Sequence, residues 1–136
     1  MDAQLGKWKV VKEETTGLDE FLTKLGLPKE AQAAYKDLDY TIETSKDGDS
    51  FKSVVNITGR DPLVYTWKLG EAFEYQSLDG TKPMLTVTEE GDTVVESYTL
   101  EKFNRQWKCV RKVDGDAMTA TTSCEDVSMV QKLKRV

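Results

Sequence analysis

Turn signals recur about every ten residues over the last hundred residues of the chain, and this spacing is the strongest constraint on its fold. The segments between them, such as 63–69 and 97–100, are rich in Val, Thr, Tyr, Trp and Phe, which favour strands. Asp-Gly pairs favour tight hairpins, because glycine readily adopts positive φ. The signals lie at residues 46–49, 59–62, 79–80, 90–92, 104–105 and 114–115.

About ten strands joined by short turns predict an all-β, antiparallel, up-and-down sheet. Closing such a sheet into a barrel removes the exposed edges that invite aggregation. No linker or repeat divides the chain, so residues 1–136 are expected to form one domain. Apolar residues make up only 38% of the sequence, which a hollow, partly wet barrel explains. A compact sandwich is the alternative that periodicity alone leaves open.

The first strand is predicted within residues 5–13. There Trp8 and Val10 alternate with Lys7 and Lys9, the period-two pattern of a strand with one buried face. This strand therefore directs its two apolar side chains toward the core.

A helical hairpin is predicted between the first and second strands. Apolar residues at i, i+3, i+4 and i+7 within 18–25 indicate a short helix that Gly26 ends. Pro28 suits the first turn of a second helix through residues 30–36, because a proline there loses no helical hydrogen bond. The first helix has an apolar face made of Leu18, Phe21, Leu22 and Leu25.

Composition argues against several functional classes. The net charge of −5 and a pI near 4.9 disfavour general nucleic-acid binding. The chain contains no histidine, the commonest general acid or base near neutral pH and a frequent metal ligand. We therefore expect no catalytic residues, no metal site and no cofactor, although carboxylate or cysteine chemistry stays open.

The N-terminus and the cysteines bear on the compartment. Residues 1–7 lack the apolar run of a signal peptide, and no stretch approaches the roughly 18 apolar residues of a membrane span. A cytoplasmic protein is expected. In a reducing cytosol Cys109 and Cys124 should be free thiols that pack as small apolar side chains.

Four ordered fragments resemble the intracellular fatty-acid-binding protein family, which includes the cellular retinoid-binding proteins. Residues 6–10 (GKWKV) resemble its opening G-x-W-x-L/V, and residues 18–26 (LDEFLTKLG) resemble F-D-E-x-x-x-x-L-G. Residues 67–74 (WKLGEAFE) and 110–116 (VRKVDGD) match two later stretches. The resemblance implies a ten-stranded β-barrel, or β-clam, with a helix-turn-helix lid between its first two strands. Leu18 stands where the family prefers phenylalanine, and residues 39–62 match poorly.

The resemblance also implies a ligand-binding site. Members that bind fatty acids hold the carboxylate with one arginine on the eighth strand, and with an arginine and a tyrosine two residues apart on the tenth. Arg111 matches the first arginine, whereas Gln131 and Leu133 replace the other two residues. Gln131 can hydrogen-bond a head group but carries no charge, so an acid would lose one charge-assisted contact.

Strand alternation extends this site. It places Trp107 and Cys109 on the face of Arg111, and Met129 and Leu133 on the face of Gln131. Exposure of Arg111 to solvent is the ordinary alternative. Inside a barrel, its guanidinium would have to meet a ligand acid or stay hydrated, because an unsatisfied buried cation is costly.

The family's lid and adjacent turns form the ligand portal, which here implies Leu22, Leu25, Ala33 and the segment around Arg60, where a portal phenylalanine is expected. Packing of the helices on the barrel mouth is the simpler interpretation. Three lid lysines suggest a transient contact with anionic membranes, although such lysines usually serve solubility. They are Lys24, Lys29 and Lys36.

These observations favour an intracellular, monomeric carrier that reversibly binds a long-chain fatty acid or a similar hydrophobic ligand. Burial of the hydrocarbon would supply most of the affinity. A retinoid or bile-acid carrier is the first alternative, because Gln131 and Leu133 replace two of the three residues with which the family holds a carboxylate. A barrel that acts mainly as a protein-interaction or structural module is the second, and an enzyme acting on a bound lipid is the third.

Overall fold

The computed structural model describes residues 2–26, 28–33, 35, 39–76, 81–101 and 104–136. Two sequence predictions lie outside these residues: the turn at 79–80, and the last part of the second helix with Lys36.

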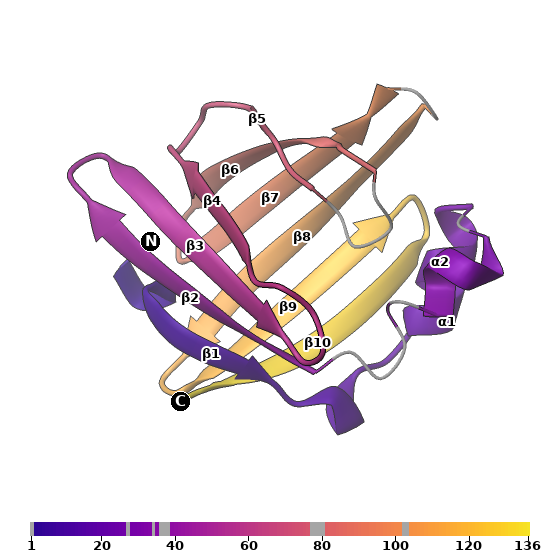
Figure 1. The fold of residues 1–136 in the computed structure, drawn as a ribbon, viewed down its shortest axis with the longest axis horizontal. Helices are drawn as coiled ribbons and strands as arrows, with labels where there is room; N and C mark the ends of the chain where they lie inside the picture. Colours follow the sequence, from indigo (N-terminus) through magenta and orange to yellow (C-terminus); the bar gives the residue numbers. More distant parts are fainter. Residues whose placement is uncertain (1, 27, 34, 36–38, 77–80, 102–103) are drawn as a thin grey trace.

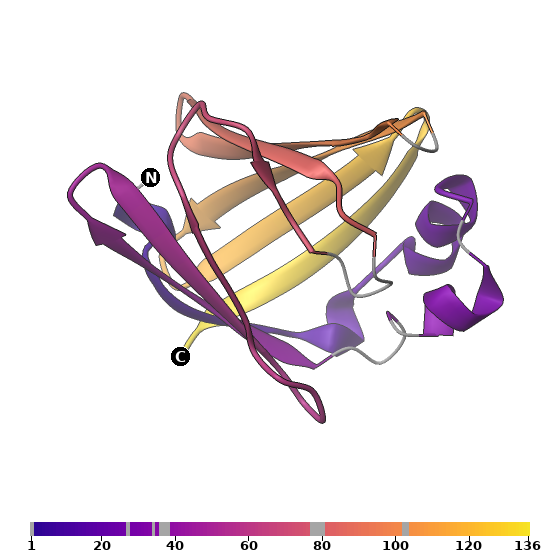
Figure 2. The same ribbon diagram turned by 45° about the horizontal axis from the view of Figure 1, so that its top comes forward.

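Ten antiparallel strands of the described chain form a single sheet that curls into a nearly closed barrel (Figures 1 and 2). The predicted all-β, up-and-down barrel is thus confirmed, and the sandwich alternative is wrong. The strands follow the order β4-β3-β2-β1-β10-β9-β8-β7-β6-β5, so that β1 and β10 pair and join the two ends of the chain. Their bounds are β1 Gly6–Val10, β2 Tyr40–Asp47, β3 Ser50–Ile57, β4 Leu63–Trp67, β5 Phe73–Glu74, β6 Met84–Glu90, β7 Thr93–Leu100, β8 Arg105–Asp114, β9 Ala117–Cys124 and β10 Val127–Arg135.

Two short helices lie between β1 and β2, as predicted. They are α1, Leu18–Lys24, and α2, Lys29–Ala33, and they lie beside one end of the barrel (Figure 2). Two 3-10 turns, Asp2–Gln4 and Lys12–Glu14, flank β1 and leave it shorter than the predicted segment.

The chain is attached to β10 just before α1. Thr16 and Val130 exchange backbone hydrogen bonds of 3.0 and 2.9 Å, which form an isolated bridge. Gly17 then starts the helix with φ of 76°, and a Cβ there would collide with the backbone carbonyl of Ser128. Only glycine combines this conformation with so close an approach, so α1 is held against β10.

The end of the barrel away from the helices is filled by a hydrophobic cluster. Trp8 is 1% exposed and donates its indole N–H to the Gln4 carbonyl at 3.1 Å, while the Arg135 guanidinium lies 4.2 Å from the centre of the ring. We call this cluster the closed-end core. Its buried members are Trp8, Val10, Cys109, Met118, Ala120 and Leu133.

A second cluster packs along β3, β4, β6 and β7. Phe51 and Trp67 stack with ring centres 4.7 Å apart, and the Trp67 indole donates a 3.0 Å hydrogen bond to Ser53. A third cluster lies under α1, where Phe21 and Leu22 contact Cys124 and Met129. Both cysteines are buried and free, as predicted.

Candidate functional site

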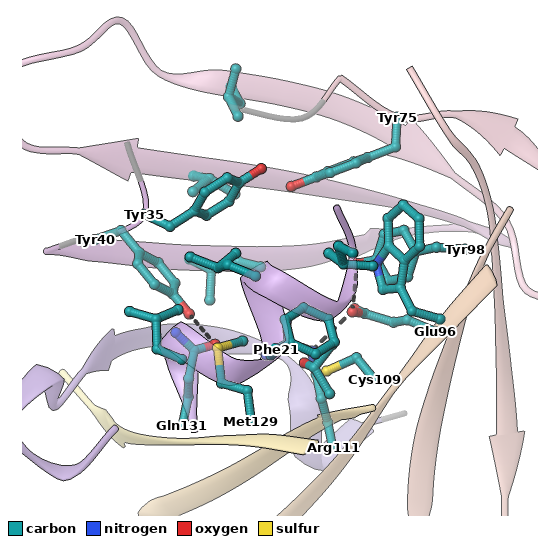
Figure 3. A pocket seen from close by; sticks show the side chains of 18 of the residues that line it. Phe21, Tyr35, Tyr40, Tyr75, Glu96, Tyr98, Cys109, Arg111, Met129 and Gln131 are labelled. Atoms are coloured by element: carbon teal, nitrogen blue, oxygen red, sulfur yellow. Dashed lines mark hydrogen bonds and ion pairs between the residues drawn. The ribbon is translucent and has the colours of Figure 1, made fainter. Parts of the chain in front are cut away.

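A cavity lies inside the barrel beneath α1 (Figure 3). The cavity has a volume of about 190 Å³. The apolar wall consists of Leu18, Phe21, Leu22, Leu25, Ile42, Val55, Ile57, Leu63, Trp107 and Met129. The remaining wall residues are Tyr35, Tyr40, Tyr65, Tyr75, Glu96, Tyr98, Cys109, Arg111, Thr122 and Gln131.

An ion pair forms part of the cavity wall. Arg111 on β8 donates from Nε to Oε2 of Glu96 on β7, at 3.1 Å. The two side chains are only 15% and 14% exposed. Burial alone lowers the pKa of Arg111, but the Glu96 carboxylate offsets this and holds the pKa well above its ordinary value. The guanidinium thus stays charged, and its partner comes from the chain itself.

Tyr98 completes this polar group. Its hydroxyl donates to the second oxygen of Glu96, Oε1, at 3.0 Å. The Tyr98 ring stacks on Trp107 with centres 5.3 Å apart, and Tyr75 contacts it edge-on at 5.8 Å. These ring contacts restrict the rotamer of Tyr98, so both oxygens of the carboxylate are held.

A second polar contact lies on another part of the wall, as Figure 3 shows. The Tyr40 hydroxyl on β2 donates to the Gln131 side-chain oxygen on β10, at 3.4 Å. Burial raises the pKa of Tyr40 to about 12. Both groups are therefore neutral near pH 7, and they offer hydrogen bonds but no charge.

Burial also perturbs the thiol in the wall. It raises the pKa of Cys109 to about 11, so the side chain is a neutral thiol near pH 7. A neutral thiol is a poor nucleophile, and Cys109 contributes apolar surface instead.

A smaller cavity of about 30 Å³ lies beyond the ion pair, toward the closed end. Thr44, Ser53 and Trp67 help to line it, and it shares Glu96 and Arg111 with the large cavity. The ion pair therefore stands at the boundary between the large cavity and the packed half of the barrel.

The structure brings most of the predicted ligand-binding residues together. Arg111, Gln131, Met129, Cys109 and Trp107 all lie in the wall of the large cavity. Arg111 has a partner that the sequence analysis did not predict, because Glu96 neutralises it from within the chain.

Leu133 does not line the cavity, in contrast to the sequence prediction. It points inward as predicted, but it lies in the closed-end core with Trp8 and Met118 rather than in the cavity wall. Leu133 is 2% exposed and lies opposite Val10 and Met118 on the neighbouring strands, which belong to the same core.

The predicted portal residues divide into two pairs. Leu22 and Leu25 line the cavity from α1. Ala33 and Arg60 are exposed and lie outside its wall, although Ile57, close to Arg60 in the chain, lies within it. A portal role for Ala33 and Arg60 therefore stays a prediction.

The described residues contain no group of three or more metal-ligating side chains. In the part of the chain with coordinates, no helix is long and apolar enough to cross a membrane.

Comparison with known families identifies the fold. The model of the lipocalin and cytosolic fatty-acid binding protein family matches residues 2–136. The chain belongs to this family. The family resemblance predicted from the four sequence fragments is thus confirmed.

Individual family members are similar over their whole length. A fatty acid-binding protein of Schistosoma japonicum is 28% identical over 136 residues, which is all of both chains. One of Lepidoglyphus destructor is 30% identical over 132 residues, covering 96% of this chain and 95% of that protein. A solved structure of the Schistosoma mansoni fatty acid binding protein in complex with arachidonic acid superimposes with a TM-score of 0.89. It is 28% identical and covers 100% of this chain and 98% of its own.

Sequence reasoning missed Glu96, Tyr98 and Tyr40 in this family member. Val94, Glu96 and Tyr98 alternate along β7, and a glutamate between two apolar neighbours on one face was the available signal. The cavity of this protein has a broad apolar wall that also contains a neutralised ion pair and a glutamine. This arrangement suits a long apolar molecule with one polar end.

Proposed function

We propose that this chain is a carrier that reversibly binds a long-chain fatty acid or a similar hydrophobic ligand. The observation that carries the proposal is the cavity beneath α1, whose wall is mainly apolar and aromatic, with Glu96 and Arg111 on one part and Gln131 on another. Relatives of matching length are named fatty acid-binding proteins, and one was solved with arachidonic acid.

Burial of the hydrocarbon is the main source of affinity in this proposal. Each buried methylene contributes about 0.8 kcal/mol. A chain of a dozen methylenes would therefore contribute on the order of 10 kcal/mol before the entropic costs of binding are subtracted. The polar groups of the wall then determine the orientation of the head group and contribute less to the affinity.

Several features of the carrier are part of the same proposal. It acts in the cytoplasm as a monomer, performs no catalysis and binds no nucleic acid. The net charge of −5 supports the last point, because phosphate binding needs a positive field.

Entry of the ligand through the helical lid also belongs to the proposal. Leu22 and Leu25 cover the cavity, so an outward movement of α1 would open it. Lys24 forms ion pairs with Glu125 at 2.9 Å and Asp126 at 3.4 Å. These two carboxylates partly neutralise its charge. A transient membrane contact would therefore rely more on Lys29 than on Lys24.

The first test is native mass spectrometry of freshly purified protein, followed by lipid extraction. A long-chain fatty acid or a related lipid at one molecule per chain is the expected result. Calorimetric titration of delipidated protein with fatty acids, retinoids and bile acids then ranks the ligand classes. Tightest binding of a retinoid or bile acid would favour that alternative, and no binding at all would favour a protein-interaction role.

A pair of variants checks that the ligand occupies the cavity. Ile57→Trp places a bulky ring in the cavity wall and should weaken binding at least tenfold. Val64→Trp makes the same residue on the outer face of β4, where Val64 is 57% exposed, and should leave binding unchanged. Equal binding by Ile57→Trp and the parent protein would contradict an internal site.

A further inference from the structure

We propose that the cavity selects a lipid whose polar end is an uncharged hydroxyl or carboxamide over one that ends in a carboxylate. The proposal rests on the proposed carrier function and specifies the head group bound at the same site. Its basis is the Glu96 side chain, which accepts from Nε of Arg111 at 3.1 Å and neutralises the guanidinium from within the chain.

The strand register builds this ion pair into the barrel. β7 is paired with β8 along its whole length, with Glu96 opposite Cys109 and Val94 opposite Arg111. The two charged residues are therefore diagonal neighbours on the inner face, 3.1 Å apart between Nε and Oε2. A ladder of backbone hydrogen bonds sets this spacing, so the pair does not depend on a mobile loop.

Contacts of the two side chains leave the pair electrically balanced. Tyr98 donates to Oε1 of Glu96, and the Nη1 atom of Arg111 lies 3.6 Å from Met118 Sδ in the closed-end core. The guanidinium thus directs one edge at Glu96 and another toward the packed end of the barrel. Among the described residues of the cavity wall, one cation is matched by one anion.

A ligand carboxylate would upset this balance. It would bring a second negative charge beside Glu96 into a site whose charged groups are about 85% shielded from water, judged by their 15% and 14% exposure. Like charges in a partly buried site repel strongly, because the surrounding dielectric is lower than that of water. A ligand acid could bind Arg111 only beside Glu96 or in its place, and a displaced buried carboxylate is itself unfavourable.

An uncharged head group meets no such cost. A hydroxyl donates to a carboxylate oxygen of Glu96 and accepts from a neighbouring donor, and a carboxamide does both at once. Gln131 and Tyr40 extend this neutral hydrogen-bonding surface on the other side of the cavity.

The experiment compares three twelve-carbon ligands that differ only in the head group: laurate, dodecanol and dodecanamide. Delipidated protein is titrated with each at pH 7.4, and binding is followed by tryptophan fluorescence, because Trp107 lies in the cavity wall. We expect dodecanol and dodecanamide to bind at least tenfold more tightly than laurate.

A charge-neutral variant tests the assignment to Glu96. Glu96→Gln keeps the shape of the side chain and removes its charge, so laurate should bind at least tenfold more tightly than to the parent protein. Dodecanol should change less than threefold. Glu90→Gln, the same substitution at an exposed position near the end of β6, is the matched control and should change neither.

The outcomes separate this inference from the carrier function. Tighter binding of laurate than of both neutral ligands by the parent protein overturns the head-group selection and leaves the carrier function standing. An unchanged ratio of laurate to dodecanol affinity in Glu96→Gln also overturns it. Failure of all three ligands to bind rejects the carrier function itself. The ligand series on the parent protein decides the question even if Glu96→Gln does not fold.

Discussion

The two ends of the barrel interior use the same strands in different ways. At the closed end, Trp8 and Leu133 are 1% and 2% exposed and pack against apolar neighbours. At the helical end, the same strands and their neighbours present tyrosines, Glu96, Arg111 and Gln131 around a cavity. One end buries apolar surface against itself, whereas the other leaves apolar surface for a ligand to bury.

We infer from this difference that stability and ligand binding depend on separate parts of one sheet. A packed cluster gains dispersion and transfer free energy on folding, but a cavity wall gains it only when a ligand arrives. The polar residues of the cavity wall reduce the free energy gained on folding, because each needs an internal partner or water. The closed end should therefore carry the stability that the cavity end cannot supply.

A matched pair of leucine substitutions tests this division most strongly. Leu133→Ala should lower the free energy of unfolding by about 4 kcal/mol, since it leaves a void in a filled core. Leu63→Ala, in the cavity wall where the side chain is half-buried, should cost about 1 kcal/mol. Urea denaturation of both delipidated variants measures the two values. Equal losses would show that the cavity wall is packed as tightly as the core.

The buried ion pair allows a second test of the division between the packed end and the cavity end. Arg111→Met leaves the Glu96 carboxylate without its cation and should lower the free energy of unfolding by about 3 kcal/mol. The double variant Glu96→Gln with Arg111→Met removes both charges and should recover all but about 1 kcal/mol. Chemical denaturation of the parent, the two single variants Arg111→Met and Glu96→Gln, and the double variant completes the cycle. Additive losses would show that water screens the pair.

Cys109 belongs to both regions and gives the smallest expected effect. Burial raises the pKa of its thiol to about 11 from 9.0. The unfolded chain loses this proton at lower pH than the folded chain, so the contribution is complete below pH 9 and disappears as the pH rises through 11. The parent should lose about 2 kcal/mol more than Cys109→Ala over this range. Stability curves that stay parallel from pH 8 to 11 would contradict it.

Much of the fold was predictable because its signals are local. Turn residues separate the strands, Trp8 alternates with lysines, and the apolar face of α1 has helical spacing. Arg111 and Gln131 were predictable as inward-facing residues, since inward and outward positions alternate along a strand.

Whether an inward-facing residue reaches the cavity depends on its level along the barrel axis, which the sequence pattern does not show. Leu133 and Gln131 share one inner face of β10, but only Gln131 reaches the cavity. Alternation tells which side of a strand a residue faces and nothing about the level at which the interior fills. That level depends on side chains from distant strands, such as Trp8 and Met118.

Local patterns in the sequence were enough to predict about ten antiparallel strands and a helical hairpin, because period-two strands and short turns act over a few residues. The choice of a closed barrel over a sandwich rested on the family resemblance. Only the tertiary structure decided that Arg111 meets Glu96. Those residues lie 15 positions apart, and their contact depends on the β7–β8 register and on curvature that turns both inward. An ion pair formed by closure of a sheet leaves no local pattern, because its strength arises only when folding removes water from both partners.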